Sequence, residues 1–285
     1  MRCRGWPLLC LAVACSRPPE PAVAQGARSP ASPAASPSGG SGGPVEGALA
    51  TSTGGSTASS PDIAAAASTT AATTGEAEAP APPYVDRMIR YDDERTSLTL
   101  EYRRLHEGGD PQDVTITPRM VVLHHTGGPS ADAAWRYFNR PTIESGRATL
   151  AKAGRVNVGA QFLVDRDGTI FRLMPEDWHA RHCVGLNHVA IGVENVGDGK
   201  EHPLTAAQIE ADARLIRYLA ATFPITHVIG HNEALQMREH PYFHEEVAGY
   251  KTRKGDPGPA FMAAVRERIA DLRLEGPPPK ADAAR

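Results

Sequence analysis

The chain has 285 residues, of which 41% are hydrophobic and 22% are charged, and its formal net charge at pH 7 is −3. This near balance of 30 basic and 33 acidic residues, with no arginine-rich helix, excludes the electrostatic footprint of a nucleic-acid binder. We therefore expect no nucleic-acid partner.

The extreme N-terminus has the pattern of an export signal. Arg2 and Arg4 precede a short apolar run at residues 8–14, which ends at Cys15 and is too short to span a bilayer. The ending "LAVAC" resembles a bacterial lipobox, in which the cysteine is lipidated, although Ala12 stands where that pattern usually has leucine. This resemblance implies a lipid anchor on Cys15 as the mature N-terminus.

The expected location follows from that anchor. Ser16 stands where many inner-membrane lipoproteins of Gram-negative bacteria have aspartate, so the resemblance implies the outer membrane, facing the periplasm. The alternative is cleavage by an ordinary signal peptidase after Ala14 or Ala24, which gives a soluble periplasmic or secreted protein.

Residues 16–83 are mostly Ala, Ser, Pro, Gly and Thr. Such a segment cannot bury enough apolar surface to offset the entropy of its chain, so we expect a disordered linker. One folded domain at 84–275 and a disordered tail at 276–285 complete the expected organisation.

Strand and helix patterns alternate through the folded part. The segment 97–106 fits either a strand or a helix. After it, the patterns predict a strand at 119–126, a helix at 130–140 capped by Ser130, and a hairpin of 160–164 and 169–174. They then predict a strand at 188–197 and a helix at 205–223 that begins with a capping box of Thr205 and Gln208. A strand at 225–231 and a last helix after Pro259 follow. This order predicts an α/β domain with a mixed central sheet flanked by helices.

Three predicted strands end in an ionisable residue: His124, Glu194 and His231. Strand ends at one sheet edge are a common place for a site, and the lack of a cysteine pair excludes a structural zinc site. A catalytic metal site with three protein ligands and a water remains, and Asp256, between a glycine and a proline, is a candidate third ligand. Glu194 could carry a proton, and Lys254 could stabilise an oxyanion.

Five segments carry a resemblance to a known family. They resemble, in order, the type 2 zinc N-acetylmuramoyl-L-alanine amidases, which include phage amidases and animal peptidoglycan recognition proteins. The segments are "VVLHHTGG", "AQFLVDRDGTIFRLMPEDWHA", "NHVAIGVENVG", "VIGHNEA" and "KGDPGPAF", and they extend from Met120 to Val265. The resemblance implies the fold of that family and hydrolysis of the amide between N-acetylmuramic acid and L-alanine of peptidoglycan.

The family's site residues carry over onto matching positions. The resemblance makes His124, His231 and Asp256 the ligands of one zinc ion, with Glu194 as the catalytic glutamate and Lys254 as the residue that stabilises the tetrahedral intermediate. Because side chains alternate along a strand, the neighbouring His125 would then point away from the metal.

The resemblance also implies a substrate groove. His179 matches a groove position, Trp178 could pack or contact a sugar, and Gln161 stands where the family usually has a groove histidine. The loop 236–253 is longer than a minimal member needs and more plausibly borders the groove; its His240 and His244 could instead bind a second metal.

Several alternatives stay open at this point. Cys183 could be a nucleophile or a small buried hydrophobe, and each site residue could be purely structural. The chain could bind peptidoglycan without cutting it, although non-cutting relatives generally lose the third ligand that Asp256 supplies here. It could also be an unrelated metal nuclease. We expect a monomer that acts on peptidoglycan or a muropeptide.

Overall fold

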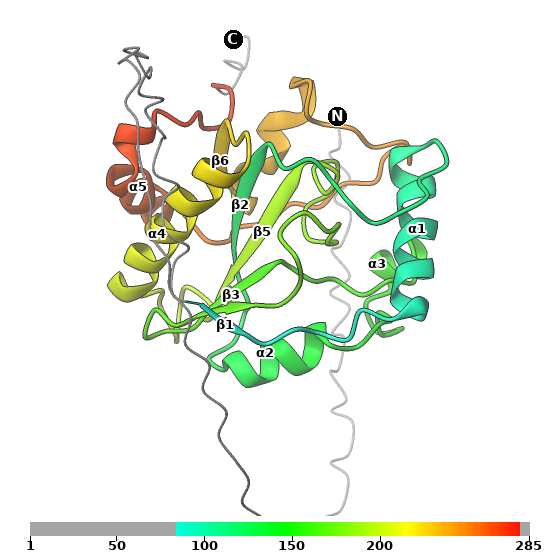
Figure 1. Ribbon diagram of the computed structural model, residues 1–285, viewed down its shortest axis with the longest axis horizontal. Coiled ribbons are helices and arrows are strands. Elements are labelled where there is room, and N and C mark those ends of the chain that lie inside the picture. Colours follow the sequence, from blue (N-terminus) through cyan, green and yellow to red (C-terminus); the bar gives the residue numbers. More distant parts are fainter. Residues whose placement is uncertain (1–83, 280–285) are drawn as a thin grey trace, which may run out of the picture. The chain divides into compact units, whose positions relative to one another are not determined.

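Six strands form one mixed sheet in the computed structural model, which describes residues 84–279 (Figure 1). The order across the sheet is β1-β4-β3-β5-β2-β6, and β3 and β4 form its antiparallel pair. The strands are β1 Tyr84–Asp86, β2 Met120–His125, β3 Phe162–Val164, β4 Ile170–Arg172, β5 Ala190–Asn195 and β6 His227–Gly230. The predicted signal, the anchor at Cys15, the linker and the end of the tail lie outside the described residues.

The predicted α/β architecture is confirmed by this sheet and its helices. The helices are α1 Asp93–Glu107, α2 Ala131–Phe138, α3 Ala148–Lys152, α4 Ala206–Thr222 and α5 Pro259–Arg268, with 3-10 helices η1 His231–Glu239 and η2 Ala270–Leu272. The ambiguous segment 97–106 lies within α1. Asp92 caps this helix by accepting a hydrogen bond from the backbone of Arg95, and two acidic residues in its first turn favour it further.

The other helix starts follow from local sequence as well. Ser130 accepts from the backbone of Ala133 at the start of α2, and Thr205 and Gln208 form both bonds of the predicted capping box at the start of α4. Pro259 occupies the first turn of α5, where its missing N–H costs nothing.

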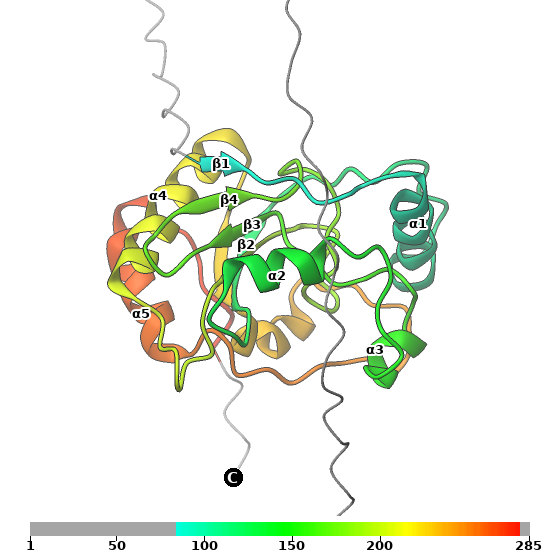
Figure 2. The ribbon, with the colours of Figure 1, turned by 90° about the horizontal axis from the view of Figure 1, so that it is seen from below.

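Helices α4 and α5 cover one face of the sheet and lie side by side in both ribbon views (Figures 1 and 2). Val121 and Leu123 of β2 and Ile191 and Val193 of β5 point into this layer and are fully buried. The alternate residues of the same strands must therefore point to the opposite face.

The opposite face is covered by α2, the loop 173–189 and η1. Met120 and Val122 of β2 pack there against Leu186 and Met237. Helix α1 lies at the side of the molecule away from α4 and α5 in both views (Figure 2). His124 has the parity of Val122, so the sheet directs it to this second face, as it does Glu194 on β5.

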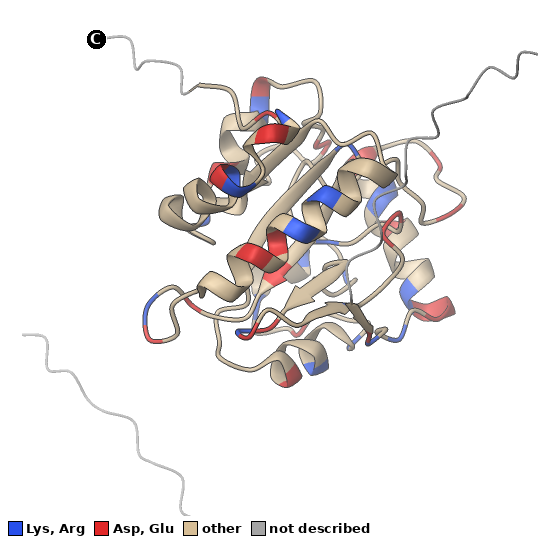
Figure 3. Cartoon of the chain, turned by 60° about the vertical axis from the view of Figure 1, so that its left-hand side comes forward, with Lys and Arg blue, Asp and Glu red and all other residues tan. Residues whose placement is uncertain are grey.

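Basic and acidic residues are interspersed along the helices in the view of Figure 3. Within residues 84–279, no helix is long and apolar enough to cross a membrane.

Candidate metal centre

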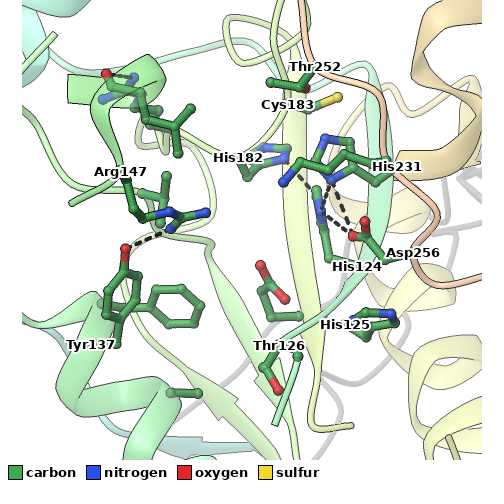
Figure 4. Close-up of a pocket in the computed structure, with 18 of the residues that line it drawn as sticks. His124, His125, Thr126, Tyr137, Arg147, His182, Cys183, His231, Thr252 and Asp256 are labelled. Atoms are coloured by element: carbon green, nitrogen blue, oxygen red, sulfur yellow. Dashed lines mark hydrogen bonds and ion pairs between the residues drawn. The ribbon is translucent and has the colours of Figure 1, made fainter. Parts of the chain in front are cut away.

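His124, His231 and Asp256 converge at the second face of the sheet, with one ligand atom of each within 4.8 Å of the others (Figure 4). Nδ1 of His124 lies 2.9 Å from Nδ1 of His231 and 3.4 Å from Oδ2 of Asp256, and His231 Nδ1 lies 3.2 Å from the same oxygen. His124, more than a hundred positions before the other two residues, therefore shares one small polar centre with them.

Strand pairing places two of the three. His124 ends β2, and the adjacent strand β6 runs parallel to it, with Gly230 opposite Leu123, so His231 follows at the same edge. Gly230 is required there, because a Cβ would lie 2.9 Å from Met262 and 3.0 Å from Pro257. The missing side chain lets the segment carrying Asp256 approach the end of β6.

The backbone of Asp256 is fixed to the element that follows β6. Asn232 donates its backbone N–H to the carbonyl oxygen of Asp256 at 2.7 Å. The carboxylate keeps only 12% of its surface exposed, and His124 and His231 keep 2% and 8%. The three groups are therefore largely removed from water.

Burial sets the charge of these groups. It lowers the pKa of His124 to about 4, and the electrostatic effect of the neighbouring His231 lowers that pKa further. Burial by itself would raise the pKa of Asp256, but its contacts with His124 and His231 outweigh burial and hold that pKa below its usual range. At neutral pH the centre thus offers a neutral imidazole and a carboxylate, the forms that bind a metal.

Glu194 lies beside this centre because β5 pairs with β2 in parallel and sets Glu194 opposite His124. Burial raises the pKa of Glu194 to about 8; the negative charge of Asp256 adds to the rise and the ammonium of Lys254 opposes it. One carboxylate oxygen of Glu194 is buried without a hydrogen-bond partner among the described residues. A partly buried carboxyl group with an unpartnered oxygen, next to a polar centre, is a candidate acid or base.

A cavity of about 470 Å³ opens over the centre. Glu194 and the exposed Lys254 line it, together with His124, His231 and Asp256. Arg147 and Tyr137 form the wall across from the metal centre, joined by a 2.7 Å hydrogen bond from the guanidinium to the phenol oxygen (Figure 4). Tyr250 and Thr252 also line the cavity, so the predicted loop 236–253 borders it.

The geometry fits a four-coordinate zinc ion. Zinc bonds of about 2.0–2.2 Å in a tetrahedron separate the ligand atoms by roughly 3.3 Å, and the three separations here are 2.9, 3.2 and 3.4 Å. Two imidazoles and one carboxylate, with a cavity on the fourth side, are the donor set of a catalytic zinc site.

The neighbouring His125 takes no part in this group. It has the parity of Val121 and Leu123 on β2, and it lines the cavity without joining the three possible ligands. The alternation expected for a histidine pair on a strand is therefore present.

A second cluster of possible ligands, Asp198, Glu201 and His202, lies in the loop before α4. Asp198 already accepts backbone hydrogen bonds from Lys200 and His202, as turn residues commonly do. His240 and His244 belong to neither group of possible ligands found in the described part of the chain.

Gln161, Trp178 and His179, which were expected to line a substrate groove, do not line the cavity over the metal centre. Gln161 is fully buried and joins two backbones, accepting from Gly192 and donating to Trp178, both at 2.7 Å. The ring of Trp178 packs on Tyr91 with centroids 4.8 Å apart.

His179 is 2% exposed and its Nε2 lies 2.6 Å from a carboxylate oxygen of Glu107 on α1. The sequence motif that contains His179 gave no sign of helix α1, because this helix lies before the motif in the chain. His179 is therefore buried against helix α1 and lies outside the cavity.

Other cavity residues were missed in the sequence. One is His182, whose Nδ1 lies 3.0 Å from Nε2 of His124. His182 and Arg147 lie outside the predicted elements, whereas Tyr137 lies on the predicted helix α2, whose pattern gave no sign that this side chain faces the cavity. Cys183 also lines the cavity but is 1% exposed, and burial raises the pKa of its thiol, which does not favour a nucleophile.

The sequence model of the family described as N-acetylmuramoyl-L-alanine amidase matches residues 114–259. No curated protein matches the chain.

Several solved structures are similar to the chain. One is the endolysin N-acetylmuramoyl-L-alanine amidase LysCS from Clostridium intestinale URNW, with 22% identity, a TM-score of 0.43 and coverage of 69% of this chain and 99% of that one. Another is the human peptidoglycan recognition protein PGRP-IBETAC in complex with glycosamyl muramyl pentapeptide, with 21% identity, a TM-score of 0.36 and coverage of 53% and 87%. The Ph2119 endolysin of a Thermus scotoductus MAT2119 bacteriophage has 18% identity, a TM-score of 0.36 and coverage of 59% and 96%.

Proposed function

The chain belongs to the N-acetylmuramoyl-L-alanine amidase family, and from this premise we propose that it is a zinc-dependent hydrolase. Its substrate is peptidoglycan or a muropeptide, and the bond it cuts is the amide between the lactyl group of N-acetylmuramic acid and L-alanine of the stem peptide. His124, His231 and Asp256 hold one zinc ion.

When bound, zinc polarises the scissile carbonyl, lowers the pKa of a water molecule and offsets the charge of Asp256 that raises the Glu194 pKa. The Glu194 carboxylate accepts a proton from the attacking water and delivers it to the leaving nitrogen. Lys254 lies at the cavity wall, within electrostatic reach of Glu194 and His124, and its ammonium faces the negative charge that develops on the carbonyl oxygen.

One observation carries this proposal: His124 Nδ1, His231 Nδ1 and Asp256 Oδ2 converge beside the partly buried Glu194, and all four residues line one cavity. A purely structural cluster of two histidines and an aspartate needs neither the cavity nor the unpartnered carboxyl oxygen of Glu194. The presence of Asp256 also disfavours a module that binds without cutting.

The test is incubation of the purified protein with a defined set of muropeptides, followed by mass spectrometry of the products. The proposal predicts a free stem peptide with N-terminal L-alanine, and loss of activity with a zinc chelator. Binding of sacculi without any cleavage product would favour the non-cutting alternative, and cleavage of a nucleic acid alone would favour a nuclease.

We further propose that the domain is tethered to the outer membrane through lipid on Cys15, with residues 16–83 as the spacer. The support is the sequence pattern, since both lie outside the described residues. Incorporation of labelled palmitate into the wild-type protein and its loss in Cys15→Ala would support the anchor. A Cys15→Ala protein that keeps both the label and the membrane fraction would contradict it.

A further inference from the structure

We propose that His182 is a positioning residue that sets the tautomer of His124, so that Nδ1 of His124 carries a lone pair toward His231 and Asp256. The proposal deepens the assignment of the metal centre and rests on it. No part of it depends on the identity of the substrate.

The first step is the hydrogen bond on the far side of His182. Its Nε2 lies 3.2 Å from the backbone carbonyl oxygen of Ala190. A carbonyl oxygen can only accept, so the hydrogen must lie on Nε2 of His182. In a neutral imidazole, Nδ1 is then the acceptor.

The second step transfers this constraint to His124. Nδ1 of His182 lies 3.0 Å from Nε2 of His124, and the two rings meet edge to face at 89°. His124 must supply the hydrogen of this bond from Nε2. Its Nδ1 is left without a hydrogen, 2.9 Å from His231 and 3.4 Å from Asp256, as metal coordination through this atom requires.

The third step is the support under His182. Its ring lies over Gly192 of β5, where a Cβ would come within 2.9 Å of the ring carbons. The amide oxygen of Asn187 accepts from the backbone N–H groups of His182 and Cys183 at 2.9 and 2.7 Å. The contact with Gly192 and the hydrogen bonds to Asn187 thereby fix the position of the His182 imidazole.

This support reaches helix α1. The amide nitrogen of Asn187 donates to the hydroxyl of Tyr102 at 3.3 Å, and Tyr102 is 2% exposed. Helix α1, Asp93–Glu107, precedes the family match at residues 114–259. An element outside the segment that matches the family therefore supports His182, the residue proposed to orient His124.

The closing experiment has two readouts besides turnover. Nuclear magnetic resonance of the metal-free full chain with ¹⁵N-labelled histidine reports which nitrogen of each ring carries the hydrogen. We expect the Nε2–H form for His124 in the wild type and an increased Nδ1–H population in His182→Ala. Chelator competition then measures zinc affinity, which should fall about 10- to 100-fold in His182→Ala, the usual effect of losing an outer partner of a metal ligand.

Two variants serve as controls. His182→Asn keeps an acceptor near the position of Nδ1 and should recover part of the affinity. His227→Ala removes a buried imidazole on β6 outside the cavity and should bind zinc as the wild type does. A wild-type His124 with its hydrogen on Nδ1, or unchanged zinc affinity in both His182 variants, would overturn the proposal.

Failure of this inference and failure of the proposed function are distinguishable. A wild-type protein that hydrolyses muropeptide while His182→Ala keeps full zinc affinity would leave the function standing and reject the role of His182. A wild-type protein that shows the predicted tautomer but hydrolyses no muropeptide would leave the orientation of His124 standing and reject the proposed function. The tautomer measurement on the wild type needs no variant, so a variant that fails to fold does not remove the test.

Discussion

His124 and Glu194 occupy the same register position on the neighbouring parallel strands β2 and β5. Neighbouring strands lie about 4.8 Å apart, and partners in register point to the same face. The spacing between a proposed metal ligand and a candidate general base is thus set by backbone pairing in the centre of the sheet. Loops then bring Asp256, Lys254 and His182 to this rigid pair.

Glu194→Gln should abolish turnover and leave zinc bound. The substitution removes the proton acceptor but none of the three ligands, and loss of a general base typically costs about 10²- to 10⁴-fold in rate. Turnover of a defined muropeptide and elemental analysis of zinc are the measurements. Full activity in this variant would reject Glu194 as the base.

Lys254→Ala should lower kcat about 10- to 100-fold with a small change in KM, because the ammonium acts on charge that develops in the transition state. Lys251→Ala is the matched control, since Lys251 is exposed in the same loop but does not line the cavity. Equal kinetics for the two variants would remove Lys254 from the mechanism.

Asp256→Ala should lose zinc and hydrolysis while it still binds sacculi. The remaining two imidazoles supply too few ligands for a catalytic zinc site, whereas most of the cavity wall is untouched. Co-sedimentation with sacculi and zinc analysis test this expectation. A variant that retains stoichiometric zinc would show that Asp256 is no ligand.

His106→Ala should destabilise the domain by about 3–5 kcal/mol. Nδ1 of His106 lies 2.7 Å from Glu245, and the side chains are 2% and 5% exposed, so removal of the ring leaves a buried carboxylate without its partner. Denaturant unfolding measures the loss. Glu245→Gln, which keeps a polar partner for the ring, should cost less, and equal costs would contradict the explanation.

Asp212→Asn should reduce the pH dependence of stability. Burial raises the pKa of Asp212 to about 8 from a usual value of 3.8, despite a hydrogen bond from Asn195. Between these pH values the folded chain keeps a proton that the unfolded chain releases, so this group's contribution falls as pH rises, by up to about 1.4 kcal/mol per pH unit.

The structure supports this prediction, because one oxygen each of Asp212 and Asn195 is buried without a partner, and a proton on the acid supplies the missing donor. The difference in unfolding free energy between Asp212→Asn and wild type should therefore grow in favour of the variant from pH 5 to pH 8. A difference that does not change with pH would contradict the assignment.

The central strands and the proposed ligands could be predicted from the sequence because the patterns that indicate them are local. Apolar runs ending in His124, Glu194 and His231 predict buried strands with polar ends, and the capping box at Thr205 predicts the start of α4. The predicted hairpin is confirmed as β3 and β4. The structure brings the three proposed ligands together, while their role as ligands stays a prediction.

The position of the expected groove residues could not be predicted from the sequence in the same way. A motif fixes which residue stands at a position, but burial depends on elements elsewhere in the chain, and His179 is covered because Glu107 of α1 bonds to it. Helix α1 itself was ambiguous by periodicity. His182 lies in a loop without a repeating pattern, so no spacing in the sequence connects it with His124.

The most direct test of the metal centre is anomalous X-ray scattering at the zinc edge from crystals of the zinc-loaded protein. We predict one peak at about 2.0–2.2 Å from Nδ1 of His124, Nδ1 of His231 and a carboxylate oxygen of Asp256. Zinc bound stoichiometrically elsewhere, or no peak between these three side chains at saturating zinc, would contradict the account.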